Sequence, residues 1–453
     1  MPSSARSAVA PLYLLACLLL GGSAQGIWQN MLLELLGVAI IAWAALVPSK
    51  ERLPLPAKRL LLLAIVAIVV VALQQVPLPA SVWSHGPRGR FAQDYHLFGQ
   101  SAPSAAISLT PYESLNALLG MIPPIAIFCA IVRLKAFRAS WLAAALLTGA
   151  VTGIALGGLQ VGSAEPNSPW YLYRETNLGV GVGFFANANH MASLLVLSLP
   201  FVAAIAAAGG ETRNMQRYSS LIIVVVALAF VLIAGIALNG SLAGYVLAVP
   251  VIAASALIVL PPMSRWRNWI GLLAALSVFA AVGALATSAV GGRKFGQDAI
   301  GSVQSRSVIL KTTTKAIFDF MPLGSGLGSF LRVYRLYESP GSVTNEYVVH
   351  AHNDFAELIL ELGVPGIILI LAFLAWWVTA VGAVWRKAEG SSFTRAATIA
   401  TAAVLVHSLV DFPLRTAAIG AAFAMCLALM ADRRVPPRQD AADLRPARHI
   451  VFA

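Results

Sequence analysis

Residues 219–238 read SSLIIVVVALAFVLIAGIAL and contain no charged side chain. A helix needs about 20 mainly apolar residues to cross a hydrocarbon layer about 30 Å thick, and only a helix satisfies its own backbone groups there. This stretch therefore predicts a membrane-spanning helix. About twelve such runs occur along the chain. They lie near residues 8–25, 30–47, 60–76, 114–132, 141–160, 190–208, 219–238, 242–261, 269–289, 366–385, 396–411 and 416–431.

The composition agrees with an all-α polytopic membrane protein. Of 453 residues, 58% are apolar and 11% are charged, whereas about a quarter of a soluble globular chain is charged. A soluble enzyme, a disordered protein and a nucleic-acid-binding domain are excluded. Cys17, Cys129 and Cys426 lie in apolar runs without metal-ligand spacing, so we expect packing residues and no metal site.

The net charge of +12 is distributed as in proteins that use basic residues to fix their orientation. With the N-terminus in the cytoplasm and one crossing per run, most of the 31 Lys and Arg fall on the cytoplasmic side. The positive-inside rule then predicts that both termini are cytoplasmic. The first run also fits a cleaved signal peptide, because Arg6 precedes its apolar core.

The chain divides into four parts by composition. Residues 1–289 hold nine predicted spans, 290–365 a long outer loop and a short interfacial helix, 366–431 three further spans, and 432–453 a disordered cytoplasmic tail. The segment from about 290 to 353 is too polar to span and too long for an ordinary connection. We expect the chemistry in this partly helical loop, which the orientation places outside.

Within this loop, residues 302–320 have helical character, and Arg306 interrupts the largely apolar stripe 303, 306, 310, 313, 317 and 320. A buried charge is costly unless an anion meets it, so Arg306 is a candidate ligand for phosphate or carboxylate. The alternative is that Arg306 extends to water or pairs with Asp319 or Glu338.

A glycine-rich stretch, Pro322-Leu323-Gly324-Ser325-Gly326-Leu327-Gly328, follows this helix. Its glycines permit tight turns and close backbone approach, which makes Gly326 a candidate contact for substrate. The stretch is not a nucleotide-binding loop, because no strand precedes it and no Gly-Lys-Ser/Thr follows it.

The loop ends with His350-Ala351-His352-Asn353-Asp354, before an amphipathic helix whose polar stripe is Asp354, Glu357 and Glu361. His352 at a helix N-terminus suits a general base, because the helix dipole favours the neutral imidazole. The alternative is a helix cap made by Asn353 or Asp354, with polar rim histidines. Gly363, Pro365 and Gly366 break the helix, so we expect its acidic turn at the outer membrane surface.

Two further groups are candidates. In Gly183-Phe184-Phe185-Ala186-Asn187-Ala188-Asn189-His190 the Asn side chains can hydrogen-bond a sugar or a pyrophosphate, although a helix cap explains Asn189 equally well. His407 and Asp411, close to Arg415, are ionisable groups at the end of a span, and they are either functional or a mutual structural pair.

These motifs together resemble the O-antigen ligase and polymerase superfamily of bacterial membrane proteins. The ligase signature is met by His352, Asn353, Gly363 and Gly366, and Arg306 before Pro322–Gly326 resembles the family's Arg element and turn. The Gly183–Asn189 stretch resembles a third family element. The resemblance covers about residues 180 to 415.

The resemblance implies a glycosyltransferase that uses a lipid-linked donor at the periplasmic face of the inner membrane. A glycan on undecaprenyl diphosphate is transferred, with inversion and without metal or other cofactor, to a sugar hydroxyl of lipid A core or of a growing polysaccharide. His352 would be the base, and Arg306 would neutralise the diphosphate. The candidate substrate-binding residues are Asn353, His350, Asn187, Asn189, Arg174, Gly326, Glu357 and Arg415.

One departure leaves the reaction open. Leu242 stands where ligases typically carry the Arg of a Ser-Arg-Gly element, so a second phosphate-binding arginine is either missing or supplied by Arg174 or Arg415. A polymerase of the same superfamily is therefore the main alternative. A polytopic transporter or flippase and a nonenzymatic scaffold are alternatives of other classes.

Overall fold

The computed structural model describes residues 3–24, 27–48, 52–84, 88–163, 165, 168–210, 215–260, 264, 266–290, 297–339, 348–386 and 390–432. This part of the chain is helical and contains no strand beyond one isolated bridge between Leu78 and Ala105. The expected tail at 432–453 lies outside the described residues except for Asp432.

The helices follow one another as α1 (Ser3–Leu20), α2 (Trp28–Leu46), α3 (Leu55–Leu73), α4 (Ala80–Trp83), α5 (Gly89–Leu97), α6 (Pro111–Leu119), α7 (Ile122–Val132), α8 (Ala139–Ser163), α9 (Ala188–Gly209), α10 (Met215–Asn239), α11 (Leu242–Val259), α12 (Trp266–Val290), α13 (Gln297–Phe320), α14 (Phe330–Tyr337), α15 (Asp354–Arg386), α16 (Ser392–His407), the 3-10 helix η3 (Pro413–Arg415) and α17 (Ala417–Ala431).

Every predicted apolar run falls on helix in this structure. Among the described residues, 8 helical segments are long and apolar enough to cross a membrane, and Ser4–Leu20, Asn268–Val278 and Ala417–Ala431 are shorter apolar helices. The protein is therefore an all-α polytopic membrane protein. The first helix packs into the main core, where Leu14, Cys17 and Leu18 are buried.

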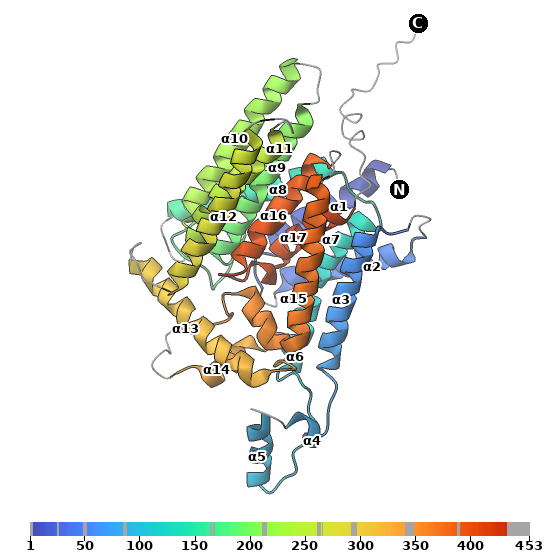
Figure 1. Cartoon of the computed structure of the whole chain (residues 1–453), viewed down its shortest axis with the longest axis vertical. Helices are drawn as coiled ribbons and strands as arrows, with labels where there is room; N and C mark the ends of the chain where they lie inside the picture. Colours follow the sequence, from blue (N-terminus) through green and yellow to red (C-terminus); the bar gives the residue numbers. More distant parts are fainter. Residues whose placement is uncertain are drawn as a thin grey trace.

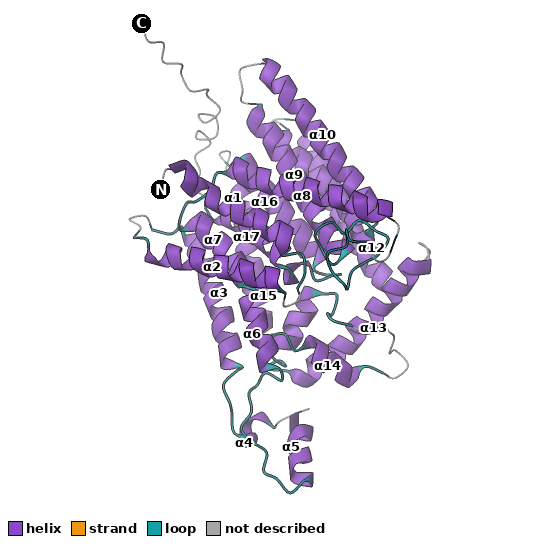
Figure 2. Ribbon diagram, turned by 180° about the vertical axis from the view of Figure 1, so that it is seen from behind, coloured by secondary structure: helices purple, strands orange, loops and turns teal. Residues whose placement is uncertain are grey.

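The helices form a bundle with two distinct ends (Figure 1). At one end, Arg6 donates to the carbonyl of Leu134, and Lys135 pairs with Asp432 at 2.6 Å. At the opposite end lie α13, α14 and an arm with α4 and α5 that projects from the body, as the view from behind also shows (Figure 2). We call this opposite end the loop end.

The helices α13 and α14 are fixed at the loop end by a small core of their own. Ile309 and Phe320 of α13 pack with Phe330 of α14 and with Ala351 and Leu360. Since Ala351 precedes His352 and Leu360 belongs to α15, this core places the long loop directly over the candidate motif.

The break in α15 lies where the sequence predicts it. Gly363 has φ 64° and ψ −141°, a backbone conformation that favours glycine. Pro365 follows and has no backbone N–H to continue the helical ladder. An acidic first part, residues 354–362, is thus set apart from the apolar part that is long enough to span.

Three details differ from the sequence-based expectation. The buried face of α13 includes Ile309, Thr313, Ala316 and Phe320, whereas Leu310 is 37% exposed, so the stripe is rotated but still includes position 306. The eleventh run ends as a helix at His407 rather than at 411. The helix α14 has only eight residues and was not predicted.

Candidate active site

The centre of the site is a contact between His352 and Asp411. The Nδ1 atom of His352 lies 3.2 Å from Oδ1 of Asp411. His352 stands in the turn before α15 with φ 49°, a left-handed conformation that is uncommon outside glycine and costs about 1–2 kcal/mol. Asp411 stands in the turn after α16, so the pair joins two turns that are far apart in sequence.

Asp411 is fully buried and anionic. Burial alone raises the pKa of this carboxyl, but the hydrogen bond from His352 and the nearby positive charges, Arg306 included, hold it well below the usual range. With Asp411 as acceptor, the Nδ1 atom of His352 carries the proton and Nε2 presents its lone pair. The His352 side chain is 25% exposed, so this lone pair can meet a substrate.

One aromatic ring organises the histidines around this pair. The ring of Phe412 lies 4.2 Å from that of His350 and 5.0 Å from those of His352 and His190, measured between centroids. Because the Phe412 amide also donates to Asp411 Oδ1 at 3.0 Å, a single residue fixes both the carboxylate and the imidazoles.

The turn that carries His352 is held by Glu357. Its Oε1 atom lies 2.8 Å from Nδ1 of His350, and its Oε2 atom accepts from the amide of Ala351 at 2.8 Å. Glu357 is 1% exposed. Its two oxygens are therefore used inside the protein, as supports for the residues immediately before His352.

Arg415 closes the same network from the other turn. Its guanidinium lies 3.1 Å from Glu361, 3.4 Å from Glu357 and 3.6 Å from Asp354. Burial lowers the pKa of Arg415, but the three carboxylates outweigh burial and raise it above the usual value. An arginine with three carboxyl partners supports the turns more readily than it binds a phosphate, which makes it a poor replacement for the arginine missing at Leu242.

Arg306 is in a different situation. It is half-buried on α13 and forms no hydrogen bond or ion pair with any residue that the structure describes. The expected alternative partners, Asp319 and Glu338, are thus not used. Its charge nevertheless acts on Asp411 and His407. A partly buried guanidinium that makes no direct ion pair with a described residue can bind an anionic group of a ligand.

Asn353 and Gly326 have structural contacts. The side chain of Asn353 accepts from the Ala356 amide at 2.9 Å, which is the cap that the alternative reading of the motif predicts, and donates to the carbonyl of Leu409. The amide of Gly326 donates to the carbonyl of Glu361, and a β-carbon at this position would collide with Ser108. The Gly-rich stretch is a joint between the long loop and the break in α15.

The residues from the third motif lie further from the pair. Asn187, not Asn189, caps α9 by accepting from the Asn189 amide at 2.8 Å. Asn189 accepts from the hydroxyl of Ser241 at 2.7 Å. Arg174 is exposed in the preceding loop and forms no ion pair within the described part of the chain. None of these three contacts His352 or Arg306.

Four functional candidates were not assigned a role from the sequence. Asp411 was considered only with His407, whose Nε2 is 4.0 Å from Asp411 Oδ2, and not as the partner of His352. His190, Ser193 and Phe412 gave no signal, because a lone polar or aromatic residue at the end of a span has many explanations. Only the packing of α9 against α16 brings them to the site.

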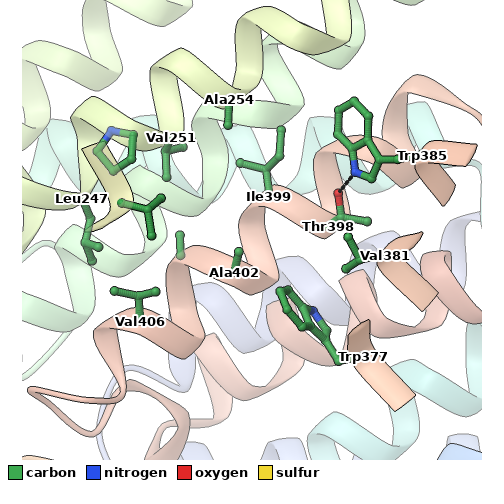
Figure 3. Close-up of a pocket in the computed structure, with 13 residues that line it drawn as sticks. Leu247, Val251, Ala254, Trp377, Val381, Trp385, Thr398, Ile399, Ala402 and Val406 are labelled. Carbon is green, nitrogen blue, oxygen red and sulfur yellow. Dashed lines mark hydrogen bonds between the residues drawn. The ribbon is translucent and has the colours of Figure 1, made fainter. Parts of the chain in front are cut away.

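An apolar cavity of about 200 Å³ lies along α16 and is lined by residues of this helix from Val406, next to His407, back to Thr398 (Figure 3). Val406 lies at one end, and Trp377 and Trp385 form part of the wall. The indole of Trp385 donates to Thr398 at 3.0 Å, and that of Trp377 donates to Thr401 at 2.9 Å. The polar edges of both indoles are thus satisfied, and the wall that remains is apolar.

These features define a class: a polytopic helical membrane protein with a buried histidine–carboxylate site at one end of its bundle. Residues 227–371 match the family model described as O-antigen ligase, and this match supports the resemblance to the O-antigen ligase and polymerase superfamily. The matched region includes Arg306 and His352 and ends before His407, Asp411 and Arg415. No curated protein matches the chain significantly in sequence. The family indicates a ligase or polymerase type of function.

Proposed function

We propose that this protein is a glycosyltransferase that moves a glycan from undecaprenyl diphosphate to a sugar hydroxyl at the periplasmic face of the inner membrane. The acceptor is lipid A core or a growing polysaccharide. The observation that carries this proposal is the 3.2 Å contact between His352 and the buried Asp411, together with the charge of Arg306, which acts on Asp411 and forms no ion pair with a described residue.

In the proposed reaction, His352 is the general base. Asp411 accepts a hydrogen bond from Nδ1–H of His352 and so orients the ring with Nε2 toward the acceptor hydroxyl. The proton of that hydroxyl moves to Nε2. The hydroxyl oxygen forms a bond to the anomeric carbon while the bond from that carbon to the diphosphate oxygen breaks. Attack opposite the leaving group inverts the anomeric centre, and His352 then releases its proton to water.

Arg306 has the second role in this proposal. Negative charge grows on the diphosphate as it departs, and a preorganised cation in a partly desolvated site stabilises that charge. A planar guanidinium can offer two parallel hydrogen bonds to phosphate oxygens, which an ammonium cannot do. The cavity beside α16 then suits the polyprenyl tail of the donor, because it is apolar and starts next to His407.

The ligase and the polymerase reactions differ in their acceptor. Leu242 opens α11 where ligases typically have an arginine, and this favours the polymerase as the second candidate. A ligase extends lipid A core with a preassembled chain, whereas a polymerase joins lipid-linked units to one another. The two are distinguished by offering the purified protein either acceptor and separating the products by size.

The test is glycan transfer by the full-length protein in detergent, with a lipid-linked glycan and without an ion gradient. We expect His352→Ala to lower the transfer rate at least about a hundredfold, because a general base contributes about that much. The control is His96→Ala, since His96 is an exposed histidine on α5 outside the site; it should transfer at the wild-type rate.

Other results would overturn the proposal. A scaffold would keep its function in cells after His352→Ala. A transporter would show no transfer in detergent and would move the lipid-linked glycan only across sealed vesicles. Wild-type transfer by His352→Ala would exclude the proposed base directly.

A further inference from the structure

Behind the His352–Asp411 pair lies a second group of polar side chains, His190, His407 and Asp411, which we call the inner cluster. These residues are 2%, 1% and 0% exposed. Four of their polar atoms have no hydrogen-bond partner within the described part of the chain: both ring nitrogens of His190, Nε2 of His407 and Oδ2 of Asp411. Buried polar atoms are rarely left without partners, so such a concentration requires an explanation.

The Asp411 carboxylate is satisfied on one side only. Oδ1 accepts hydrogen bonds from Nδ1 of His352 at 3.2 Å and from the Phe412 amide at 3.0 Å. Oδ2 receives nothing and lies 4.0 Å from Nε2 of His407. A distance of 4.0 Å is too long for a direct hydrogen bond. It suits two hydrogen bonds of about 2.8 Å that meet at one water oxygen.

The tautomer of His407 is linked to the direction of the Ser193 hydroxyl. The hydroxyl of Ser193 lies 3.1 Å from the carbonyl of Asn189 and 2.7 Å from Nδ1 of His407. If its proton goes to the carbonyl, Nδ1–H donates to Ser193 and Nε2 is a lone pair facing the lone pairs of Asp411. If its proton goes to Nδ1, then Nε2–H points across the same gap. In either tautomer a water molecule satisfies both Nε2 and Oδ2.

His190 offers a further partner for the same water. Its buried ring acts electrostatically on Asp411 and His407, and its edge meets Phe412. A buried water needs two to four polar partners, and the inner cluster provides three residues with unsatisfied atoms. The apolar alternative, an empty gap, would leave an anionic carboxylate oxygen bare in a site of low dielectric.

We propose that one ordered water molecule bridges Asp411 and His407, and that His407, fixed by Ser193, is a positioning residue that holds the Asp411 carboxylate in line with His352. The positioning role rests on the proposed function, whereas the water does not. This proposal also assigns a structural role to the Gly183–His190 motif. Hydrogen bonds from Ser241 to Asn189, and from Ser193 to Asn189 and His407, connect α11 and α9 to the inner cluster.

The first test is a high-resolution cryo-EM map of the full-length protein in lipid nanodiscs. We expect density for a water molecule at hydrogen-bonding distance from both Asp411 Oδ2 and His407 Nε2. Direct contact between these two atoms, or an empty gap between them, would overturn the proposal. This outcome does not depend on knowing the glycan.

The second test compares His407→Leu with His407→Gln in the transfer assay. His407→Leu removes the bridge, so we expect kcat to fall about tenfold to a hundredfold at unchanged KM, because a misplaced catalytic group loses rate rather than substrate affinity. His407→Gln keeps a polar group near the position of Nε2 and should restore most of the rate.

The pH–rate profile separates positioning from a merely structural role. The groups that face Asp411 are His352, His190, His407 and Arg306, so loss of the bridge should displace the acid limb of the profile for His407→Leu. The control is Ser198→Ala, a buried residue of α9 outside the site whose hydroxyl donates to the Leu194 carbonyl. It should lose stability but keep the wild-type kcat and profile.

An unchanged kcat and profile in His407→Leu would refute the positioning role. If the wild-type chain transferred no glycan, the proposed function would fail, and the map would still decide whether the water is present.

Discussion

His352 combines a strained backbone with a supported side chain. Two hydrogen bonds maintain its φ of 49°: Glu357 accepts one from the preceding amide of Ala351, and Asp411 accepts one from the His352 ring. Strain of this kind persists only where the surroundings over-determine it, and it is frequent at functional sites. The three carboxylates around Arg415 belong to this support, and they make the arginine the residue on which the two turns depend.

Removal of that arginine should destabilise the protein in a pH-dependent way. The pKa of Arg415 is raised, so its stabilising charge is fully present below the usual arginine pKa and is lost only above that range. In Arg415→Met, three buried carboxylates lack their cation, at a cost of about 3–5 kcal/mol. Burial favours their protonated forms, so the deficit should grow from pH 5 to pH 8.

Thermal unfolding of the purified variant and of wild type across that pH range measures this effect. Arg174→Met is the control, because Arg174 is exposed and has no ion pair within the described residues. A deficit that is constant with pH would contradict the assigned role of Arg415.

At the scale of elements, the Gly-rich stretch joins the long loop to the break in α15. Gly324 has φ 76°, and a β-carbon there would collide with the carbonyl of Glu361. Arg88 donates to the Gly324 carbonyl at 2.8 Å, and Gln74 donates to those of Leu323 and Glu361. Three segments at the loop end thus meet at one turn, and the orientation of α13, which carries Arg306, depends on it.

The change Gly324→Ala should therefore cost about 2 kcal/mol or more, from the left-handed backbone and the collision together. Gly158→Ala is the matched control, since Gly158 lies within α8 with open space at its β-carbon position. Alanine in a helix interior is favoured over glycine, so this variant should unfold at or above the wild-type temperature. Equal melting temperatures for both variants would show that the joint is not rigid.

At the scale of the whole molecule, hydropathy was sufficient to locate the long apolar helices, and Gly363 with Pro365 was sufficient to locate the break in α15. Both depend on local sequence. The register of α13 could not be predicted, because its buried face is set by contacts with α15 and α14, which lie elsewhere in the sequence. Asp411 could not be assigned to His352, because nothing in the spacing of two turns reveals that they meet.

The cavity beside α16 allows a test of the proposed binding site for the polyprenyl tail of the donor. Ala402→Phe places a ring among the lining residues, so it should raise the KM for a full-length polyprenyl donor about tenfold, the equivalent of about 1.4 kcal/mol. A donor with a short tail should be used as well as by wild type. Val378→Phe is the control, because Val378 is 60% exposed on α15 and is not part of the lining.

Initial rates with both donors measure this difference. If Ala402→Phe impaired both donors equally, the tail would lie elsewhere, and the cavity would have only a packing role.

The contact between His352 and Asp411 also constrains when the protein can become active during its synthesis. A ribosome that has completed residue 371 has made the entire family-matched region, including Arg306 and His352, but not Asp411, which orients the base in the proposed mechanism. That mechanism therefore predicts a nascent chain that is inactive while α16 is being inserted and becomes active only with the last helices.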